Sequence, residues 1–544
     1  MVEPDGSVYL EVALPQIRRL LGLQDRNPGS STYGCFDRSF WHYRVLDFAN
    51  GRQQEAALTL ALAYHISHPL NPYFGKEKMK QWCLAALQFL TAIQNGDGSF
   101  NEYYPHEHAF VTTAFAAFAG SEALLLLNEK PPSTVEMLTK CGKFLLKRDE
   151  LEVVNQNLGA ASALYNIHLL TNEEKFKKGA YSKIKTSLES QSPEGWFHEY
   201  GGPDIGYLSV AVSYLAHFYY KTRDAQALAG LKKAVTFLSH FIHPDGTAGG
   251  EYGSRNTFYL IPDGIEICAQ VDPCAGYLAR EIRTSLARKG FSPADLDNRY
   301  LCNMLYNYVQ AYRMCNPVRE HTSPEPVLYE ESGLLVEKRD QYHMVTNLRK
   351  GGVFKVFCHG ELVASDCGIL GRLSDGTLVT SQWLGTSFTR KRSGGSTQYV
   401  VTGQLMKVPE QQMTPLKTMI LRGSLTIGQK YVSDLAKNLL RKQLITQKNA
   451  VPLFFERRLT LSSDIHVTDK LRGTGEFAML HLVTNASLIY VPSSRYFRIT
   501  ELSTPLYLTD DLSDLFNTKG ELVLERNITC DTWQSPLRNP PGAH

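Results

Sequence analysis

Five short segments of the chain are dense in residues that can bind and process a sugar. Aromatic rings stack on pyranose faces, and amides, imidazoles, guanidinium groups and carboxylates bond hydroxyls or move protons. A concave surface built from such residues is typical of a carbohydrate site. The candidate residues are Arg38, Trp41, His42; Tyr104, His106, His108; Asn155, Gln156, Asn157; Glu199, Tyr200, Asp204, Tyr207; and Tyr252, Arg255, Asn256.

The spacing of these segments predicts that they share one end of a helical ring. Gly-rich breaks at 94–100 (QNGDGSF), 192–197 (SPEGWF) and 243–247 (HPDGT), with a polar break at 147–149, recur about every 50 residues. Further breaks lie near Asp37 and Asp297. Six units of this length hold two helices each, so we expect a ring of helical hairpins. The turns that feed the inner helices would gather around one cavity.

The hydrophobic pattern changes along the chain and predicts two domains. In residues 1–315 apolar residues recur every three or four positions, which is helix periodicity. In residues 331–544 short runs alternate apolar and polar residues between Gly and Asp turns. Residues 316–330, with three prolines, read as a linker. We therefore predict an (α/α) toroid followed by an antiparallel β-sandwich.

Composition excludes several classes of protein. Lys+Arg is 57 and Asp+Glu is 54, so the net charge is +3, which argues against a dedicated nucleic-acid binder. The chain has no P-loop and no Gly-x-Ser-x-Gly motif. The apolar stretch 109–127 contains Thr, Ser and Glu, so we expect a buried helix there and no membrane insertion.

The compartment is predicted from the N-terminus and the cysteines. The start, MVEPDG, lacks the basic and apolar regions of a signal peptide. None of the ten cysteines forms a C-x-x-C motif, and we read them mostly as buried thiols of a reducing compartment. We expect a cytoplasmic protein, or a secreted or periplasmic one if a signal has been removed.

The order of toroid and sandwich resembles the heparinase II/III-like polysaccharide lyases, a superfamily that includes related uronyl epimerases. The segments that carry the resemblance are 155–161 (NQNLGAA), 199–207 (EYGGPDIGY) and 249–257 (GGEYGSRNT), and in the second half 351–357 (GGVFKVF) and 362–368 (LVASDCG). The resemblance spans most of the chain. It implies an acidic, uronate-containing polysaccharide or oligosaccharide as substrate and cleavage by β-elimination.

The resemblance also suggests roles for individual residues. Asn155 or Asn157 matches the asparagine that neutralises the uronate carboxylate. Tyr207 fits the proton-transferring tyrosine best, and Tyr200 is its rival. Many relatives carry a His-x-His-x-Asp loop at the start of the sandwich, whereas this chain offers only His359 there. The usual acid/base pairing is therefore altered, or the reaction is changed or lost.

The β-elimination reaction needs only a few functional groups. Neutralising the carboxylate lets charge develop on it as the C5 proton leaves, and an acid protonates the departing O4. A tyrosine can serve if a nearby cation such as Arg255 lowers its pKa. Arg255 could instead bind the carboxylate or make a structural ion pair, and the asparagines and Tyr207 could be caps or core residues. No cofactor is required, and His106 and His108, two residues apart, are poorly placed for a metal.

Other functions stay open from the sequence. A C5-epimerase needs the same residues and returns the proton to the opposite face. The carboxylates Glu107, Glu199, Asp204 and Glu251 keep an α/α-toroid glycoside hydrolase possible in principle. A non-catalytic glycan-binding or assembly protein is the third class. The sequence does not predict an oligomeric state.

Overall fold

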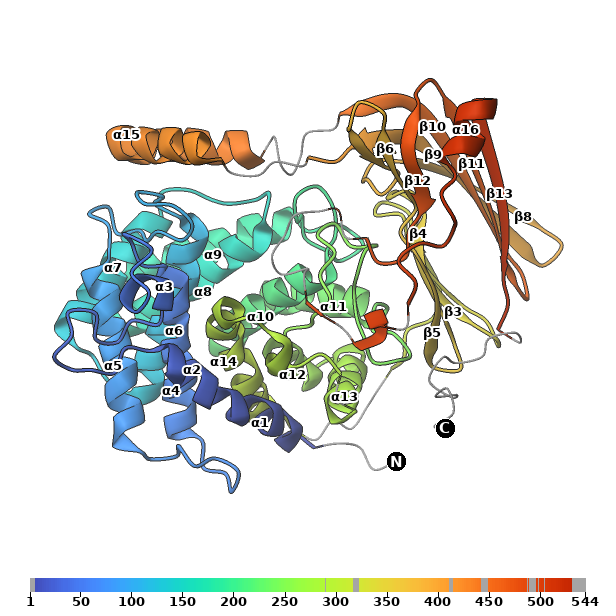
Figure 1. The fold of residues 1–544 in the computed structure, drawn as a ribbon. Coiled ribbons are helices and arrows are strands. Elements are labelled where there is room, and N and C mark those ends of the chain that lie inside the picture. The colour runs from blue at the N-terminus through green and yellow to red at the C-terminus, as the bar shows by residue number, and fades with distance from the viewer. Residues whose placement is uncertain are drawn as a thin grey trace, which may run out of the picture.

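The computed structural model describes residues 5–288, 290–316, 322–409, 414–441, 449–486, 488, 496–497, 499–502 and 504–530, with 429–441 and 499–500 described as backbone only. Within these residues, helices fill the N-terminal part and antiparallel sheets the C-terminal part, as predicted (Figure 1).

Six helices of the described chain form the inner wall of the toroid, and six units flank it on the outside. The inner helices are α4 (Ala56–His65), α6 (Phe110–Leu127), α8 (Val154–Thr171), α10 (Ile205–Thr222), α12 (Asp263–Ala269) and α14 (Asn298–Met314). The outer ones are α5 (Glu77–Ala92), α7 (Pro132–Leu145), α9 (Glu174–Glu189), α11 (Ala225–Ser239), α13 (Pro273–Ala287) and the pair α1 (Ser7–Ala13) and α2 (Ile17–Leu23). Each inner helix contacts the next, and α14 contacts α4, so the ring closes.

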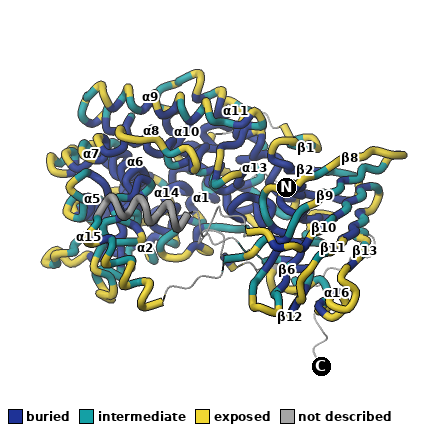
Figure 2. The backbone as a smooth tube through the Cα atoms, turned by 90° about the horizontal axis from the view of Figure 1, so that it is seen from above, coloured by how far each residue is buried: buried dark blue, intermediate teal, exposed yellow. Residues whose placement is uncertain are grey.

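Hydrophobic patterning separates inner from outer helices. In α6 nearly every residue from Phe110 to Leu124 is buried, because the helix is covered on both sides. In α9 the buried residues Phe176, Ala180 and Ile184 recur along one stripe, and the opposite face meets solvent. Figure 2 shows the same contrast, with buried tube in the middle of the toroid and exposed turns around it.

One described helix, Phe110–Leu127, is long and apolar enough to cross a membrane by length and composition alone. Of its apolar window, 72% is buried inside the protein. That burial is what an inner helix of the ring requires, since its neighbours pack on every side.

Six connections lead from an outer helix to the next inner helix. They span residues 24–55, 93–109, 146–153, 190–204, 240–262 and 288–297, and 24–55 also holds the short helices α3 (Arg38–Trp41) and η2 (Gly51–Glu55). Two inner helices begin at an aspartate: Asp204 accepts from the Tyr207 amide at 3.2 Å and Asp297 from the Tyr300 amide at 2.9 Å. These caps end the loops and start the helices that carry the site.

The C-terminal part contains two antiparallel sheets that share one core. The first sheet has the order β1 (Val327–Tyr329), β2 (Leu334–Lys338), β3 (His343–Asn347), β4 (Val353–Cys358), β5 (Glu361–Asp366). The second has the order β12 (Phe477–Leu482), β6 (Ile369–Leu373), β7 (Leu378–Thr380), β9 (Ser396–Lys407), β10 (Ala450–Leu461), β11 (Ile465–Gly473), β13 (Glu521–Ile528), with β8 (Ser387–Ser393) on β9. Met344 and Phe354 of the first sheet pack with Val401 and Leu459 of the second. Strand β1 begins inside the stretch 316–330 that we read as a linker, and residues 317–321 of that stretch lie outside the described chain.

Two helices interrupt the sandwich. The long α15 (Pro415–Arg441) lies between β9 and β10, and Figure 1 shows it beside the toroid, away from the sheets. Arg422 makes an ion pair of 3.2 Å with Asp47 of the first long connection. The short α16 (Ser513–Lys519) packs on β12. The sequence pattern predicted strands alone here.

The first sheet holds the connection 240–262 of the toroid. The buried Lys350 amine donates to the carbonyls of Glu251 (2.7 Å) and Gly253 (2.6 Å) and to the Asn256 side chain (2.5 Å). Asn347 donates to the Tyr252 carbonyl at 2.8 Å. The sandwich therefore fixes one of the loops that surround the cavity.

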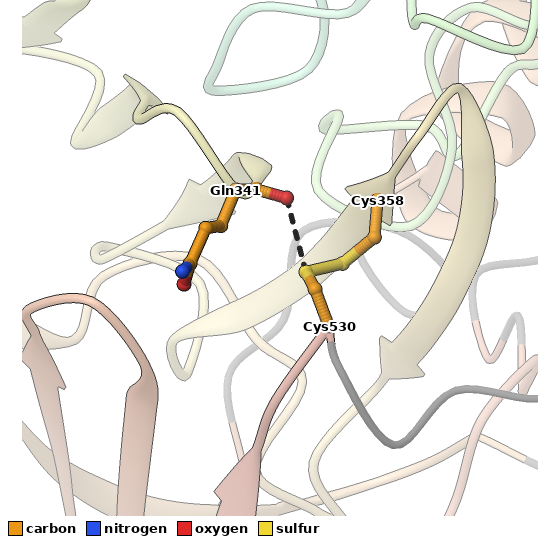
Figure 3. The surroundings of a disulfide bond; sticks show 3 residues. All are labelled: Gln341, Cys358 and Cys530. Carbon is orange, nitrogen blue, oxygen red and sulfur yellow. Dashed lines mark hydrogen bonds between the residues drawn. A yellow bond between two sulfur atoms is a disulfide. The ribbon is translucent and has the colours of Figure 1, made fainter.

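A disulfide joins Cys358, at the end of β4, to Cys530, just after β13 (Figure 3). The Sγ atom of Cys530 lies 3.1 Å from the carbonyl oxygen of Gln341. The prediction of free thiols is wrong for this pair, because sheet packing brings together two cysteines 172 residues apart. The other eight cysteines are free, and all but Cys274 and Cys315 are buried.

Candidate active site

A cavity lies within the ring of inner helices. Among the described lining residues there is one cation, and there are three side-chain amides, five tyrosines and no carboxylate. The lining residues are Arg52, Phe115, Asn155, Tyr207, Val210, Ser213, Tyr214, Tyr259, Ile261, Tyr300, Asn303, Met304, Tyr306 and Asn307.

Two inner helices supply most of this lining from one face each. In α14 the lining residues Tyr300, Asn303 and Asn307 are three and four positions apart, so they lie one above another on the helix. In α10, Tyr207 lies in the first turn and Ser213 nearly two turns deeper. The cavity is therefore a well whose depth follows the helix axes.

Asn155 and Glu199 meet at the upper part of the well. The Asn155 side chain donates to Glu199 Oε1 at 2.8 Å, and both residues are buried. Burial holds the pKa of the Glu199 carboxyl well above its ordinary value, although the Asn155 hydrogen bond lowers it. The raised pKa favours the neutral form of Glu199, and its carboxyl orients the Asn155 amide.

Asp204 ties Tyr207 to Arg255. One carboxylate oxygen accepts from the Tyr207 amide, and the other accepts from the Arg255 amide at 2.9 Å. The Thr257 hydroxyl also donates to Asp204. One carboxylate therefore sets the start of α10 and the path of the connection that carries Arg255.

Arg255 is a buried cation with unused donors. It is 3% exposed, and its Nη2 donates to the Tyr200 carbonyl at 3.2 Å. The guanidinium carbon lies 4.7 Å from the centre of the Tyr200 ring. Within the described residues Nε and Nη1 have no hydrogen-bond partner. Burial lowers the pKa of the guanidinium, while Tyr200, Asp204 and Tyr207 oppose that shift.

The floor of the well is a buried polar cluster around Asp263. Asp263 Oδ2 accepts from the Ser213 hydroxyl (3.0 Å) and the Asn307 amide (3.1 Å), and it lies 2.9 Å from His217 Nε2. Ser213 and Asn307 line the cavity, whereas Asp263 and His217 do not. The cluster fixes the two polar groups at the base of the well.

Arg52, the one cation of the lining, is held by buried carboxylates. Its Nε lies 2.7 Å from Glu55 Oε1, and its Nη1 lies 4.0 Å from Glu102. Burial raises the pKa of Glu55 to about 7, although Arg52 lowers it. Arg299 also pairs with Glu102. The network presents Arg52 to the cavity in a fixed position.

The structure separates Asn155 from Asn157. Asn157 is fully buried and faces the outer helix α9, where it donates to the Ser187 hydroxyl at 3.1 Å and accepts from the Lys183 amine at 3.2 Å. Gln156, between them, is half-buried and does not line the cavity. Of the two candidate asparagines, the geometry brings only Asn155 to the cavity.

Two candidates from the fifth segment are packed between the domains. Asn256 is bonded to Lys350, and the Tyr252 hydroxyl lies 2.9 Å from His243 Nε2. Neither lines the cavity. Their hydrogen bonds hold the connection 240–262 in place, so their contacts in this structure are structural ones.

The remaining candidates also lie outside the cavity lining. His108 Nδ1 lies 3.0 Å from Asp97 in its own loop, and the half-buried Tyr104 and His106 lie in the same loop. The Trp41 indole donates to the Leu23 carbonyl at 2.8 Å. Arg38 stacks on Tyr43, His42 is exposed, and His359 lies in the exposed turn between β4 and β5.

Sequence reasoning missed several lining residues, among them Arg52, Ser213, Asn303 and Asn307. The search followed the residues just after each loop marker, whereas these lie in η2 or deeper along the inner helices. Asn303 and Asn307 did leave a signal, because amides four residues apart on the apolar face of a helix are unusual. No group of three or more described His, Cys, Asp or Glu residues could hold a metal ion.

Similar folds occur among solved structures, although no family model and no curated protein matches the sequence. Chondroitin AC lyase of Streptomyces coelicolor A3, solved with chondroitin sulphate, is 10% identical over 88% of this chain and 68% of its own, with a TM-score of 0.53. A mutant heparan sulfate lyase HepC from Pedobacter heparinus is 10% identical over 87% of this chain and 70% of its own, with a TM-score of 0.43.

A mutant unsaturated glucuronyl hydrolase from Streptococcus agalactiae is 14% identical over 57% of this chain and 77% of its own, with a TM-score of 0.35. At these identities the comparison shows a shared fold, and the argument for it rests on the first structure. The predicted order of an α/α toroid and a β-sandwich is confirmed, and this chain shares its fold with the chondroitin AC lyase.

Proposed function

We propose that this protein cleaves a uronate-containing acidic polysaccharide by β-elimination in the cavity of the toroid. The observation that carries the proposal is the chemistry of the described lining: a cation, three amides and five tyrosines, without a carboxylate. Amides and a cation can accept an anionic sugar, whereas a lining carboxylate would repel it.

Asn155 is assigned to the uronate carboxylate. Its amide is oriented by Glu199, and an amide N–H directed at the carboxylate stabilises the charge that develops there when the C5 proton leaves. Burial raises the pKa of Glu199 and so favours its neutral form, which would not oppose the incoming anion.

Tyr207 is assigned to proton transfer. It lines the cavity together with Asn155, and the Asp204 cap fixes the first turn of its helix. The base takes the proton from C5, a C4–C5 double bond forms, the C4–O4 bond breaks, and the leaving oxygen takes up a proton. Among the described residues no histidine lines the cavity, so the acid and base roles fall to tyrosines.

Arg255 supports Tyr207 electrostatically. It is buried beside Tyr200, and its Nε and Nη1 have no hydrogen-bond partner within the described residues. Tyr207 is among the groups whose charge raises the pKa of Arg255. A buried cation close to a phenol favours the phenolate, which is the form that accepts a proton. Tyr200 is thereby assigned to holding Arg255.

A glycoside hydrolase is less well supported by the cavity. Hydrolysis needs an acid and a base or nucleophile that are usually both carboxyl groups at the bond to be cleaved. Glu199 accepts a hydrogen bond from the Asn155 side chain, and Asp204 caps helix α10. Glu251 pairs with Lys355 at 3.1 Å between the domains. None of the three lines the cavity.

One panel of acidic glycans separates the candidate activities. The proposal predicts a product that absorbs in the ultraviolet because it carries an unsaturated uronide. New reducing ends without that absorbance would instead indicate hydrolysis. Solvent deuterium at C5 without chain cleavage would indicate epimerisation, and saturable binding without turnover would indicate a glycan-binding protein.

A further inference from the structure

We propose that Lys350 of the β-sandwich is a positioning residue for Arg255. Its ammonium group serves as a fixed cation around which residues 251–256 fold, and it thereby holds Arg255 beside Tyr200. The effect of Lys350 on turnover rests on the proposed function, whereas its effect on the shape of 251–256 does not.

The Lys350 ammonium is surrounded by three oxygen atoms of one short segment. Lys350 is fully buried. Its Nζ donates to the carbonyls of Glu251 (2.7 Å) and Gly253 (2.6 Å) and to the side-chain oxygen of Asn256 (2.5 Å). An ammonium group has three N–H donors and no acceptor. The three donors match the three acceptors, so the ammonium occupies the centre of the segment as a bound cation would.

Arg255 lies between these acceptors in the sequence. Two of them precede it, and Asn256 follows it directly. The Arg255 amide donates to Asp204 at 2.9 Å, and its Nη2 donates to the Tyr200 carbonyl at 3.2 Å. The toroid therefore holds Arg255 itself, and the sandwich holds the backbone on either side of it.

The segment 251–256 has no regular secondary structure that could maintain its shape. It lies in the connection between α11 and α12, and all six of its residues are buried. Asn256 has a φ of 58°, in the left-handed region that few residues with a side chain adopt. A buried carbonyl without a donor is costly. Loss of the ammonium would therefore release the segment from this shape.

The sandwich presents Lys350 from a fixed turn between β3 and β4. The Lys350 amide donates to the Asn347 carbonyl at 3.2 Å, and the Asn347 side chain donates to the Tyr252 carbonyl at 2.8 Å. The next residue, Gly351, has a φ of 71°, and a Cβ there would lie 2.2 Å from the Ser381 carbonyl oxygen. The position of the ammonium is therefore set by the sheet and not by the segment that it holds.

Lys350 carries its third donor only when it is protonated. Burial, with a smaller contribution from Arg255, lowers the pKa of the Lys350 amine to about 7, although Asp204 and Glu251 raise it. The ammonium form therefore predominates below that pH. A neutral amine has two N–H donors and would leave one of the three oxygens without a donor.

Hydrogen–deuterium exchange at pH 6 tests the effect on the segment without any substrate. In the native protein the amides of Gly250 and Ser254 donate to the carbonyls of Thr257 and Pro203, both at 2.8 Å, so they should be protected. Lys350→Met removes the ammonium and keeps most of the side chain. We expect amides of residues 250–257 to exchange roughly tenfold faster or more in this variant, with α8 and β10 unchanged. Native exchange rates at 250–257 would overturn the proposal.

Tyr329→Phe is the matched control for this measurement. The Tyr329 hydroxyl lies 3.1 Å from Nδ1 of His240, at the start of the same connection 240–262. The variant therefore also removes a contact between the sandwich and this connection. We expect it to leave exchange at 250–257 unchanged. An increase equal to that of Lys350→Met would show that any weakening of the domain contact releases the segment, which would refute a particular role for the ammonium.

A small amine should restore the segment in the Lys350→Ala protein. Propylammonium has three carbons and one nitrogen, which are the atoms that this substitution removes. At pH 6 we expect propylammonium chloride to slow exchange at 250–257 and to raise the melting temperature of the variant. Tetramethylammonium chloride, which has no N–H donor, should do neither at the same concentration. A variant that folds only with propylammonium supports the proposal, whereas equal responses to the two salts would overturn it.

Turnover shows whether Lys350 acts through Arg255. Neither residue lines the cavity, so Lys350→Met should lower kcat roughly tenfold or more and leave KM within about twofold of native. Adding Lys350→Met to Arg255→Ala should lower kcat no further, because no guanidinium is left to position. Effects that multiply would contradict this path. If no glycan is turned over, the proposed function fails, and the exchange measurement still decides the role of Lys350.

Discussion

The side chain of Asn155, the second residue of α8, donates a hydrogen bond of 2.8 Å to Glu199, which lies in the connection 190–204. That connection leads to α10. The pair therefore couples the residue that would neutralise a substrate carboxylate to the loop that carries Tyr207. The role that we propose for this pair requires the neutral form of Glu199, which its raised pKa favours.

Substituting Glu199 tests this dependence. Because burial raises the pKa of its carboxyl, Glu199→Gln resembles the native state and should keep most of the turnover near neutral pH. Glu199→Ala leaves Asn155 unsupported, and a lost buried hydrogen bond of about 1–3 kcal/mol predicts a roughly 5- to 150-fold lower kcat. An inactive Glu199→Gln protein of native stability would instead indicate a proton-transfer role for Glu199.

Asn155 and Asn157 form a matched pair for separating activity from stability. Asn155→Ala should abolish most turnover with little change in the free energy of unfolding. Asn157→Ala should lower that free energy by about 1–3 kcal/mol, because Ser187 and Lys183 lose a buried partner, while the folded protein keeps its kcat. Denaturant unfolding and kinetics on both variants check this. Equal effects of the two substitutions on kcat would contradict the assignment.

Glu55 should make stability depend on pH. Its folded pKa of about 7 lies above its ordinary value of 4.5, so its contribution is complete below about pH 4.5 and is lost as the pH rises through about 7. The difference corresponds to about 3 kcal/mol. Glu55→Gln should flatten this part of the profile in denaturant unfolding at pH 5 and pH 7.5. Parallel profiles of the two proteins would exclude Glu55 as the source.

The disulfide Cys358–Cys530 should stabilise the sandwich. It closes a loop with a sequence separation of 172, and removing such a crosslink typically costs about 2–4 kcal/mol. A reductant should lower the melting temperature of the native protein but not that of the Cys358→Ser, Cys530→Ser double variant. An identical response of both proteins would show that the disulfide does not form. Because disulfides persist in oxidising compartments, its formation would favour the secreted or periplasmic alternative over the cytoplasmic location that we predicted.

The architecture could be predicted because it follows from local sequence patterns. Breaks at regular spacing give the hairpin ring, and the change from helix to strand periodicity gives the two domains. The disulfide and the α15 insertion could not be predicted in this way. The first depends on contacts between distant strands, and the second interrupts an otherwise strand-like pattern.

The site was predictable only in part. Asn155, Tyr207 and Arg255 follow loop markers; the first two line the cavity, whereas Arg255 lies outside its lining. Asn157 follows the same marker, but two residues along a helix turn a side chain to another face. Arg52 and the amides of α14 reach the cavity only because of the way the ring closes, and no local sequence pattern indicates that closure.

The most direct test of the mechanism is the rate at which the ultraviolet-absorbing product forms with the Tyr207→Phe protein, on the glycan that the native protein cleaves. The substitution removes one oxygen atom, so binding of that glycan and the melting temperature should stay close to native. We predict that product formation falls at least 100-fold. Near-native turnover would contradict the role of Tyr207 and, with it, the proposed elimination in this cavity.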